Sequence, residues 1–320
     1  MYKLKKALGT KNDLVLWPGD KNTTLEKVTV GCFPPGETLL VPIMGEDGDQ
    51  WASVAEHAGF EVIRLGSEWG ETIRGEDLEL LLRNMNEKSV KGILLTAHET
   101  STGVVVDVEP IAKKCREKGI ACIVSAWDIL GAIGLAMDDW NVDLLVTEVL
   151  EEVCLVSAGP KAWRCLQKID DLKRSPGEQN RSKDQLSLRL LDSIGRILEV
   201  NLPKEYEKIK KTIRAGIQTM GLELLVKGDE IASPVFTTVR LPGGVDVDRV
   251  LDGIAEQGVG GVSRLKRKEN QIIRVDHREC RNLELILSLC RALGIAVSNQ
   301  GIPLQIQEGI NRAQEVYYSE

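Results

Sequence analysis

The chain has 320 residues and a mass of 35.3 kDa, with 42% hydrophobic and 28% charged residues. This composition is ordinary for a globular protein and excludes a disordered, collagen-like or fibrous chain. No apolar run reaches the roughly 18 residues of a transmembrane helix. The N-terminus lacks the apolar stretch of a signal peptide. We therefore predict a cytoplasmic protein that makes no contact with a membrane.

Charge is unevenly spread along the chain. Residues 1–160 hold 15 Lys and Arg against 26 Asp and Glu, whereas residues 161–320 hold 26 against 22. The acidic first half argues against a polyanionic partner. We interpret the basic cluster of Arg264, Lys266, Arg267 and Lys268 as a solvated turn between strands. Nucleic acid is therefore not a predicted partner.

The cysteines and histidines give no metal signature. None of the seven cysteines forms a C-x-x-C pair, and the three histidines are far apart in the sequence. Most of the cysteines sit inside apolar stretches, which favours buried, reduced thiols. We predict no metal site.

The first half alternates short apolar runs with amphipathic segments. The runs predict strands at 14–17, 38–43, 61–65, 92–96, 120–124 and 144–147, and the segments predict helices at 51–57, 76–84 and 108–118. Such alternation indicates an α/β fold, with a mostly parallel sheet and helices on both faces. We assign residues 1–175 to this large domain.

The pattern changes from about residue 162. Apolar positions at helical spacing predict helices over 185–200 and from Pro203 to Met220. Strands at 222–226, 235–241 and 271–275 and helices at 247–255 and 283–293 complete the pattern. We therefore predict connecting helices and a small α+β domain over residues 176–295, with a boundary near Ser175-Pro176-Gly177.

Residues 296–320 form a predicted C-terminal amphipathic tail. Pro303 can open a helix whose one apolar stripe is Ile306, Ile310, Ala313 and Tyr317. So short a helix is not stable alone in water and must dock on its own chain or on a partner. We expect it to cover apolar surface at or near a homodimer interface. The alternative is a mobile tail that binds a partner protein through residues 303–320.

Two segments carry more information than the alternation alone. One is Glu99-Thr100-Ser101-Thr102-Gly103-Val104, directly after an apolar strand, and the other is 37–70, which contains Trp51 and Glu68-Trp69-Gly70. In this order and spacing they resemble class V aminotransferases of fold type I, the alanine–glyoxylate and serine–pyruvate type. The resemblance covers about residues 10 to 295. It implies the fold type I PLP-transferase fold and a homodimer.

The resemblance also implies a pyridoxal 5'-phosphate (PLP) site at the carboxyl ends of the parallel strands. PLP needs a Schiff-base lysine, an acid for the pyridine nitrogen, a phosphate turn, a stacking ring and an arginine for the substrate carboxylate. By the resemblance, Asp20-Lys21-Asn22-Thr23 replaces the phosphate turn, Asp47 the ring and Ser125 the acid. Glu151 stands at the place of the lysine. We therefore predict a degenerate member that lacks the Schiff-base lysine and binds no cofactor.

Some family features are retained. Glu99 and Thr100 belong to the retained loop, and Arg274 is either a retained carboxylate clamp or a paired arginine at a strand end. We predict no catalytic residue. The expected vestigial cofactor site comprises Asp20, Asp47, Glu99, Thr100, Ser125 and Glu151, with no lysine amine in its centre. Lys161 matches a surface position. The sequence also lacks an N-terminal segment that the family uses to close the partner's site, so we expect a truncated large domain.

Three functions are compatible with these residues. The first is a non-catalytic aminotransferase homologue that acts as a binding, regulatory or scaffold subunit. The second is an active PLP-dependent aminotransferase with a displaced lysine. The third is a cofactor-free enzyme that reuses an acidic cleft of Asp20, Asp47, Glu151 and Glu152, because crowded carboxylates have raised pKa values.

Overall fold

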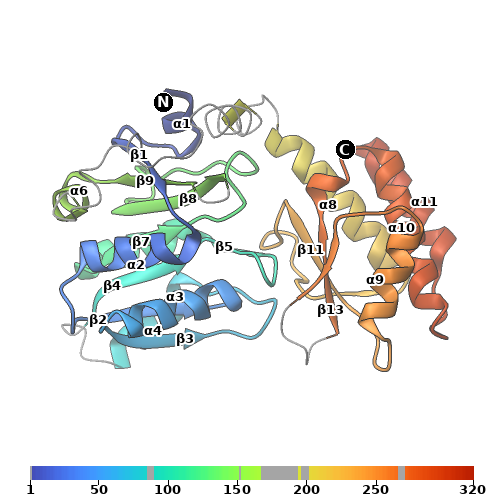
Figure 1. The fold of residues 1–320 in the computed structure, drawn as a ribbon, viewed down its shortest axis with the longest axis horizontal. Helices are drawn as coiled ribbons and strands as arrows, with labels where there is room; N and C mark the ends of the chain where they lie inside the picture. Colours follow the sequence, from blue (N-terminus) through green and yellow to red (C-terminus); the bar gives the residue numbers. More distant parts are fainter. Residues whose placement is uncertain (1, 85–89, 151–152, 167–193, 196–201, 266–270) are drawn as a thin grey trace. The chain divides into compact units, whose positions relative to one another are not determined.

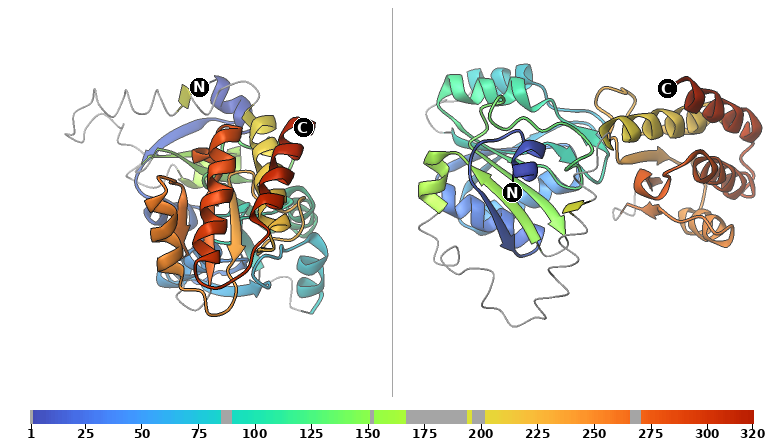
Figure 2. Two further views of the ribbon diagram at one scale, coloured as in Figure 1. Left: turned by 90° about the vertical axis from the view of Figure 1, so that its right-hand side faces the viewer. Right: turned by 90° about the horizontal axis from the view of Figure 1, so that it is seen from above.

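The computed structural model describes residues 2–84, 90–150, 153–166, 194–195, 202–265 and 271–320. The described residues form two compact units (Figures 1 and 2). One unit draws on 1–100 and 105–200, and the other on 101–104 and 201–320. Among the described helices, none has the length and apolarity needed to cross a membrane.

The first unit is built on a seven-stranded sheet in the order β1–β9–β8–β7–β4–β2–β3. The strands are β1 (Leu14–Pro18), β2 (Thr38–Ile43), β3 (Glu61–Gly66), β4 (Val90–Thr96), β7 (Ala121–Ser125), β8 (Leu144–Leu150) and β9 (Val153–Ala158). Neighbours from β3 to β8 pair in parallel, and β9 runs antiparallel to both β8 and β1. The predicted mostly parallel α/β sheet is confirmed.

Helices cover both faces of this sheet (Figure 2). They are α1 (Tyr2–Ala7), α2 (Lys21–Cys32), α3 (Glu46–His57), α4 (Gly75–Asn84), α5 (Val108–Lys118) and α6 (Pro160–Leu166). The apolar pattern did not predict α2, because threonines and a glycine interrupt its apolar stripe. Two short strands, β5 (His98–Glu99) and β6 (Val104–Val105), form a separate ladder after β4.

The second unit has a four-stranded antiparallel sheet in the order β10–β11–β13–β12. The strands are β10 (Glu223–Leu224), β11 (Phe236–Arg240), β12 (Val262–Arg264) and β13 (Ile272–Asp276). The helices are α8 (Leu202–Thr219), α9 (Val247–Glu256), the 3-10 turn His277–Glu279, α10 (Leu283–Ser298) and α11 (Ile306–Ser319). The predicted helix at 185–200 and the boundary at 175–177 lie outside the described residues, apart from 194–195.

The C-terminal helix α11 docks on its own chain. Ile310 and Ala313 are buried, and α11 packs against α8 and α10. The helix begins at Ile306 rather than Pro303, because the Gln305 N–H donates to the carbonyl of Met220 and holds the preceding segment extended. In this structure α11 is thus packed on its own chain. The binding of a partner protein through residues 303–320 and the homodimer interface both stay predictions.

Two glycines allow α8 and α11 to approach closely. A Cβ at Gly309 would lie 2.6 Å from the carbonyl oxygen of Gly216 and 2.9 Å from Cβ of Met220. Backbone cannot move away as a flexible side chain can. The contact therefore requires glycine at position 309.

We predict that Gly309→Ala destabilises the protein by about 1–3 kcal/mol through overpacking. The direction of the change in the free energy of unfolding is informative, because alanine in an unconstrained helix stabilises by about 1 kcal/mol relative to glycine. Urea denaturation measures the change. Gln314→Ala, at an exposed position of α11, is the control and is expected to leave stability nearly unchanged. A stabilised Gly309→Ala variant would contradict the close approach.

Candidate functional site

The carboxyl ends of the parallel strands gather most of the predicted site residues on one edge of the first unit. Asp20 follows β1, Asp47 lies in the first turn of α3 after β2, Glu99 and Thr100 follow β4, and Ser125 ends β7. Parallel strands place the loops after their carboxyl ends on the same edge. Glu151 and Glu152 lie outside the described residues, and Arg274 belongs to the second unit.

Asp47 and Glu99 hold two of these loops together. The carboxylate oxygens of Glu99 accept the N–H groups of Asp47 at 3.0 Å and Gly48 at 3.1 Å, at the N-terminus of α3. Asp47 Oδ2 accepts the N–H of Thr100 at 2.7 Å and its hydroxyl at 2.6 Å. Glu99 is fully buried. Both carboxylates are thus used in a reciprocal link that satisfies a helix N-terminus.

Asp20 occupies the N-terminus of α2. Its Oδ1 accepts the N–H of Thr23 at 2.8 Å, in the geometry of an N-cap. By the resemblance this helix start is the phosphate turn. A carboxylate therefore stands where an anion would otherwise benefit from the helix dipole and free N–H groups.

The end of β7 supplies hydroxyls instead of a carboxylate. Ser125 is fully buried, and its Oγ lies 3.5 Å from Oγ1 of Thr96 on the paired strand β4. On the other side, the hydroxyl of Thr147 donates to the carbonyl of Ala126 at 2.5 Å. A serine hydroxyl carries no charge that would keep a pyridine nitrogen protonated.

Lys21, the first residue of α2, places an ammonium among acidic groups at this edge. Its Nζ lies 3.1 Å from Asp128 Oδ2, 3.6 Å from Glu148 Oε2 and 5.5 Å from the ring centroid of Trp127. Burial lowers the pKa of Lys21, but the charges of Asp128, Glu148 and Asp47 outweigh that effect and raise the pKa above its usual value. The amine is therefore held as an ammonium.

The segment after β7 is shaped to meet this ammonium. Asp128 has a left-handed backbone, with φ at 59°, which aspartate tolerates better than most residues. Trp127 is 1% exposed, and its carbonyl accepts a hydrogen bond of 2.7 Å from Nδ1 of the buried His98. Burial lowers the pKa of His98. The histidine therefore supports the Trp127 loop as a neutral ring.

Lys21 was not among the predicted site residues, although its partners place its amine at the carboxyl edge. Its partners Asp128 and Glu148 are distant in the chain, so local patterns do not reveal them. The expectation that no lysine amine lies in the centre of the cofactor site stays a prediction.

In the second unit, Arg274 lies on β13 with its guanidinium over the ring of Phe236, at 4.4 Å. The end of the retained loop belongs to this unit as well. Thr238 Oγ1 donates to the carbonyl of Thr102 at 2.6 Å, and the N–H of Ser233 donates to the carbonyl of Gly103 at 2.8 Å. Stacking on a buried aromatic ring gives Arg274 a structural role and leaves the carboxylate-clamp interpretation open.

His277 follows β13 directly and is held against β11 as a neutral ring. Its Nδ1 donates to the carbonyl of Pro234 at 2.6 Å, and its Nε2 accepts the hydroxyl of Thr237 at 2.8 Å. Burial lowers the pKa of His277 to about 4. Both ring nitrogens are engaged, so His277 fixes the start of the 3-10 turn to β11.

Comparisons with known proteins agree with this architecture. Residues 18–148 match the family model for aminotransferase class-V. An uncharacterized aminotransferase of Methanocaldococcus jannaschii is 24% identical over 99% of this chain and 88% of its own. A protein named soluble hydrogenase, small subunit, of a Synechococcus species is 24% identical over 84% of this chain and 75% of its own. The structure of ureidoglycine–glyoxylate aminotransferase from Bacillus subtilis superimposes with a TM-score of 0.88 at 22% identity, covering 99% of this chain and 88% of that one.

The chain is similar to class V aminotransferases over residues 18–148. Its fold is that of the PLP-dependent aminotransferases. The described residues at the carboxyl edge do not fit the cofactor of that fold. Asp20 caps α2, whose start is the phosphate turn by the resemblance, and Ser125 stands at the place that the resemblance gives to the acid. The Lys21 amine is bound as an ammonium by two carboxylates. We therefore derive no reaction step through PLP.

We predict that Lys21→Met destabilises the protein by about 1–3 kcal/mol, since it leaves Asp128 and Glu148 without their shared cation. Combined with Asp128→Asn, it is expected to show a coupling energy of about 0.5–3 kcal/mol in a double-mutant cycle. Urea denaturation of the four proteins gives this energy. The exposed Lys5–Asp13 pair is the matched control, expected at about 0.2–1 kcal/mol. Additive effects at Lys21 and Asp128 would contradict the ion pair.

We also predict a pH effect from His277. Its pKa is about 4 when folded and 6.5 when unfolded, so the unfolded chain takes up the proton first as the pH falls. Stability is therefore lost below pH 6.5, by about 3 kcal/mol in total, and the loss levels off below pH 4. His277→Gln removes this contribution from the pH dependence. Denaturation at several pH values measures it, with the exposed His57→Gln as control. Equal slopes for wild type and His277→Gln would contradict the buried neutral ring.

Proposed function

We propose that this chain is a class V aminotransferase-like protein that does not act as a transaminase and serves as a binding or regulatory subunit. The observation that carries the proposal is the Lys21 ammonium bound by Asp128 and Glu148 against Trp127. Its partners place this amine at the carboxyl edge. The homodimer implied by the resemblance remains part of this proposal.

The charge state of Lys21 supports the absence of Schiff-base chemistry. A lysine attacks an aldehyde as the neutral amine, and enzymes that use one lower its pKa through an apolar or cationic neighbourhood. Here the neighbourhood is anionic and raises the pKa of Lys21. Asp128 and Glu148 are also engaged, so neither is available to protonate a pyridine nitrogen without releasing the lysine.

The cofactor-free acidic enzyme has less support. It needs several carboxylates that converge without partners. Asp20 instead caps α2, and Asp47 binds both the N–H and the hydroxyl of Thr100. These contacts favour the interpretation of Asp20 and Asp47 as acids that stabilise loops over that of an acidic catalytic cleft.

The competing function is an active aminotransferase with a displaced lysine, which the names of several relatives favour. Lys21 is then the residue that would carry the Schiff base. Lys161 is unsuited, since it lines a cavity at the amino ends of the strands, on the other edge of the same sheet. One labelling experiment separates the two functions.

We predict that PLP followed by borohydride reduction does not label Lys21. Peptide mass spectrometry assigns each pyridoxyl-lysine, and Lys21→Met supplies the matched control. The expected result is the same low, scattered labelling of exposed lysines in both proteins and no amino-group transfer from alanine or serine to glyoxylate. Stoichiometric labelling of Lys21, with transfer activity that Lys21→Met abolishes, would overturn the proposal.

A further inference from the structure

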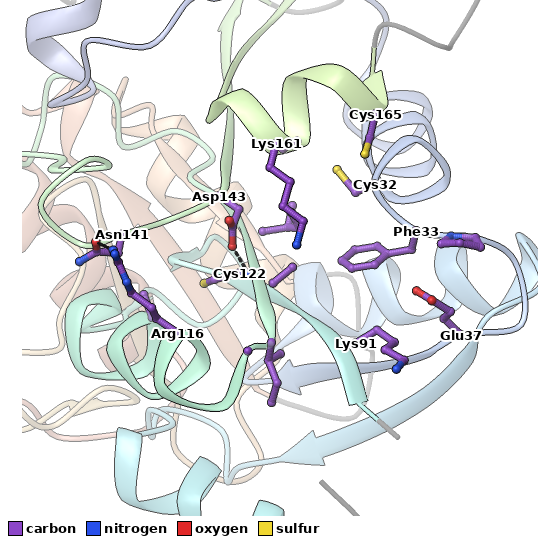
Figure 3. Close-up of a pocket in the computed structure, with 17 residues that line it drawn as sticks. Cys32, Phe33, Glu37, Lys91, Arg116, Cys122, Asn141, Asp143, Lys161 and Cys165 are labelled. Carbon is purple, nitrogen blue, oxygen red and sulfur yellow. Dashed lines mark hydrogen bonds between the residues drawn. The ribbon is translucent and has the colours of Figure 1, made fainter. Parts of the chain in front are cut away.

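The amino edge of the first unit, where the parallel strands begin, carries a cavity. None of the carboxyl-edge residues described above lines it. Its volume is about 620 Å³, within the range of about 300–1,000 Å³ typical of small-molecule sites. The lining comes from the residues that precede or begin the strands β2, β4, β7 and β8 and from the ends of α2, α5 and α6 (Figure 3).

The cavity carries an excess of one cationic side chain. Its charged lining residues are Lys91, Arg116, Lys161, Glu37 and Asp143. The amine of Lys161 points into the space beside Asp143 and the Phe33 ring (Figure 3).

The acidic groups are placed at its margins or tied to backbone. Asp143 Oδ2 accepts the N–H of Cys122 at 2.8 Å, so this carboxylate is partly neutralised by the start of β7. Glu37 lies at the far end, next to Lys91 (Figure 3). Arg116 is fixed at the opposite end by a hydrogen bond to the side-chain oxygen of Asn141. Cationic groups therefore stand at both ends of the cavity and beside its middle.

The remaining lining is neutral and includes flat apolar surface. Phe33, Ile120 and Ile123 are almost fully buried side chains that line the space. The sulfur atoms of Cys32 and Cys165 face each other at one side (Figure 3). Burial raises the pKa of Cys32 to about 12, so this thiol is neutral and does not repel an anion.

We infer that this amino-edge cavity binds a small organic anion, with a carboxylate or phosphate group held by Lys161 and a flat apolar body against Phe33. A charged group paired with lysine supplies charge-assisted hydrogen bonds, and the aromatic wall supplies apolar contact. The inference does not depend on the proposed function, because it uses the opposite edge of the sheet.

The test is isothermal titration calorimetry with 1-naphthyl phosphate and 1-naphthoate as probes, and with neutral 1-naphthol as their uncharged counterpart. We expect both anions to bind and 1-naphthol to bind at least about tenfold more weakly. Equal binding of the anions and 1-naphthol would overturn the inference. A preference between the two anions distinguishes a phosphate from a carboxylate ligand.

Variants test where the anion binds and whether cationic side chains strengthen and acidic side chains weaken its binding. Lys161→Met is expected to weaken anion binding about tenfold, Arg116→Met, at one end of the cavity, to weaken it less, and Glu37→Gln to tighten it. Lys113→Met is the control, because this exposed lysine lies on the same helix as Arg116 and does not line the cavity. Unchanged affinity in Lys161→Met, or an equal loss in Lys113→Met, would refute the site. Reductive labelling with PLP distinguishes the two proposals, because modification of Lys21 reports on the carboxyl edge and modification of Lys161 reports on the cavity.

Discussion

One ammonium shared by two carboxylates organises the carboxyl edge of the first unit. Lys21 begins α2, Asp128 follows β7 and Glu148 lies on β8. These segments meet only when β7 pairs with β8 and β9 brings β1 alongside. At about 4 Å and an effective dielectric near 20, each attraction is about 4 kcal/mol before desolvation. Without the Lys21 ammonium, the same strand order would place the carboxylates of Asp128 and Glu148 near each other with no shared cation. The ion pairs and the pairing of β7 with β8 therefore stabilise each other.

Carboxylates of the chain also accept the free N–H groups at two helix N-termini of this edge. In a parallel sheet the N-termini of the following helices point toward the carboxyl edge, and their free N–H groups attract anions. Here Asp20 satisfies the start of α2, and Glu99 satisfies the start of α3. The chain's own carboxylates thus accept N–H groups at both helix starts.

The sequence predicts the sheet well where local patterns decide the structure. β2 and α5 have the predicted bounds, because an uninterrupted apolar run and a clear helical stripe mark them. The apolar pattern does not predict α2, because Thr23, Thr24 and Thr29 interrupt the apolar stripe of this helix. Its first residue is Lys21, so the most informative side chain of the edge belongs to the helix with the weakest pattern.

The positions of the site residues were predictable from strand order, but their partners were not. Asp47 binds Thr100 across 53 positions, and Lys21 binds Asp128 across 107. Such pairs depend on how loops from separate strands turn at the edge. The left-handed backbone of Asp128 is one such turn. A pattern of types and spacings does not specify it, because aspartate adopts this conformation only where its surroundings stabilise it.

At the opposite edge, a single glycine lets the Phe33 ring of the cavity wall lie against β4. A Cβ at Gly92 on β4 would lie 2.2 Å from Cζ of Phe33, so any larger residue would push the ring away from the strand. Phe33 is 5% exposed and belongs to the core of the first unit. Because a glycine in a strand is intrinsically unfavourable, its use here has a physical reason: the aromatic wall needs close contact with the backbone of β4. Charge pairs between loops therefore organise the carboxyl edge, whereas a close contact between a ring and the strand backbone shapes the wall of the amino-edge cavity.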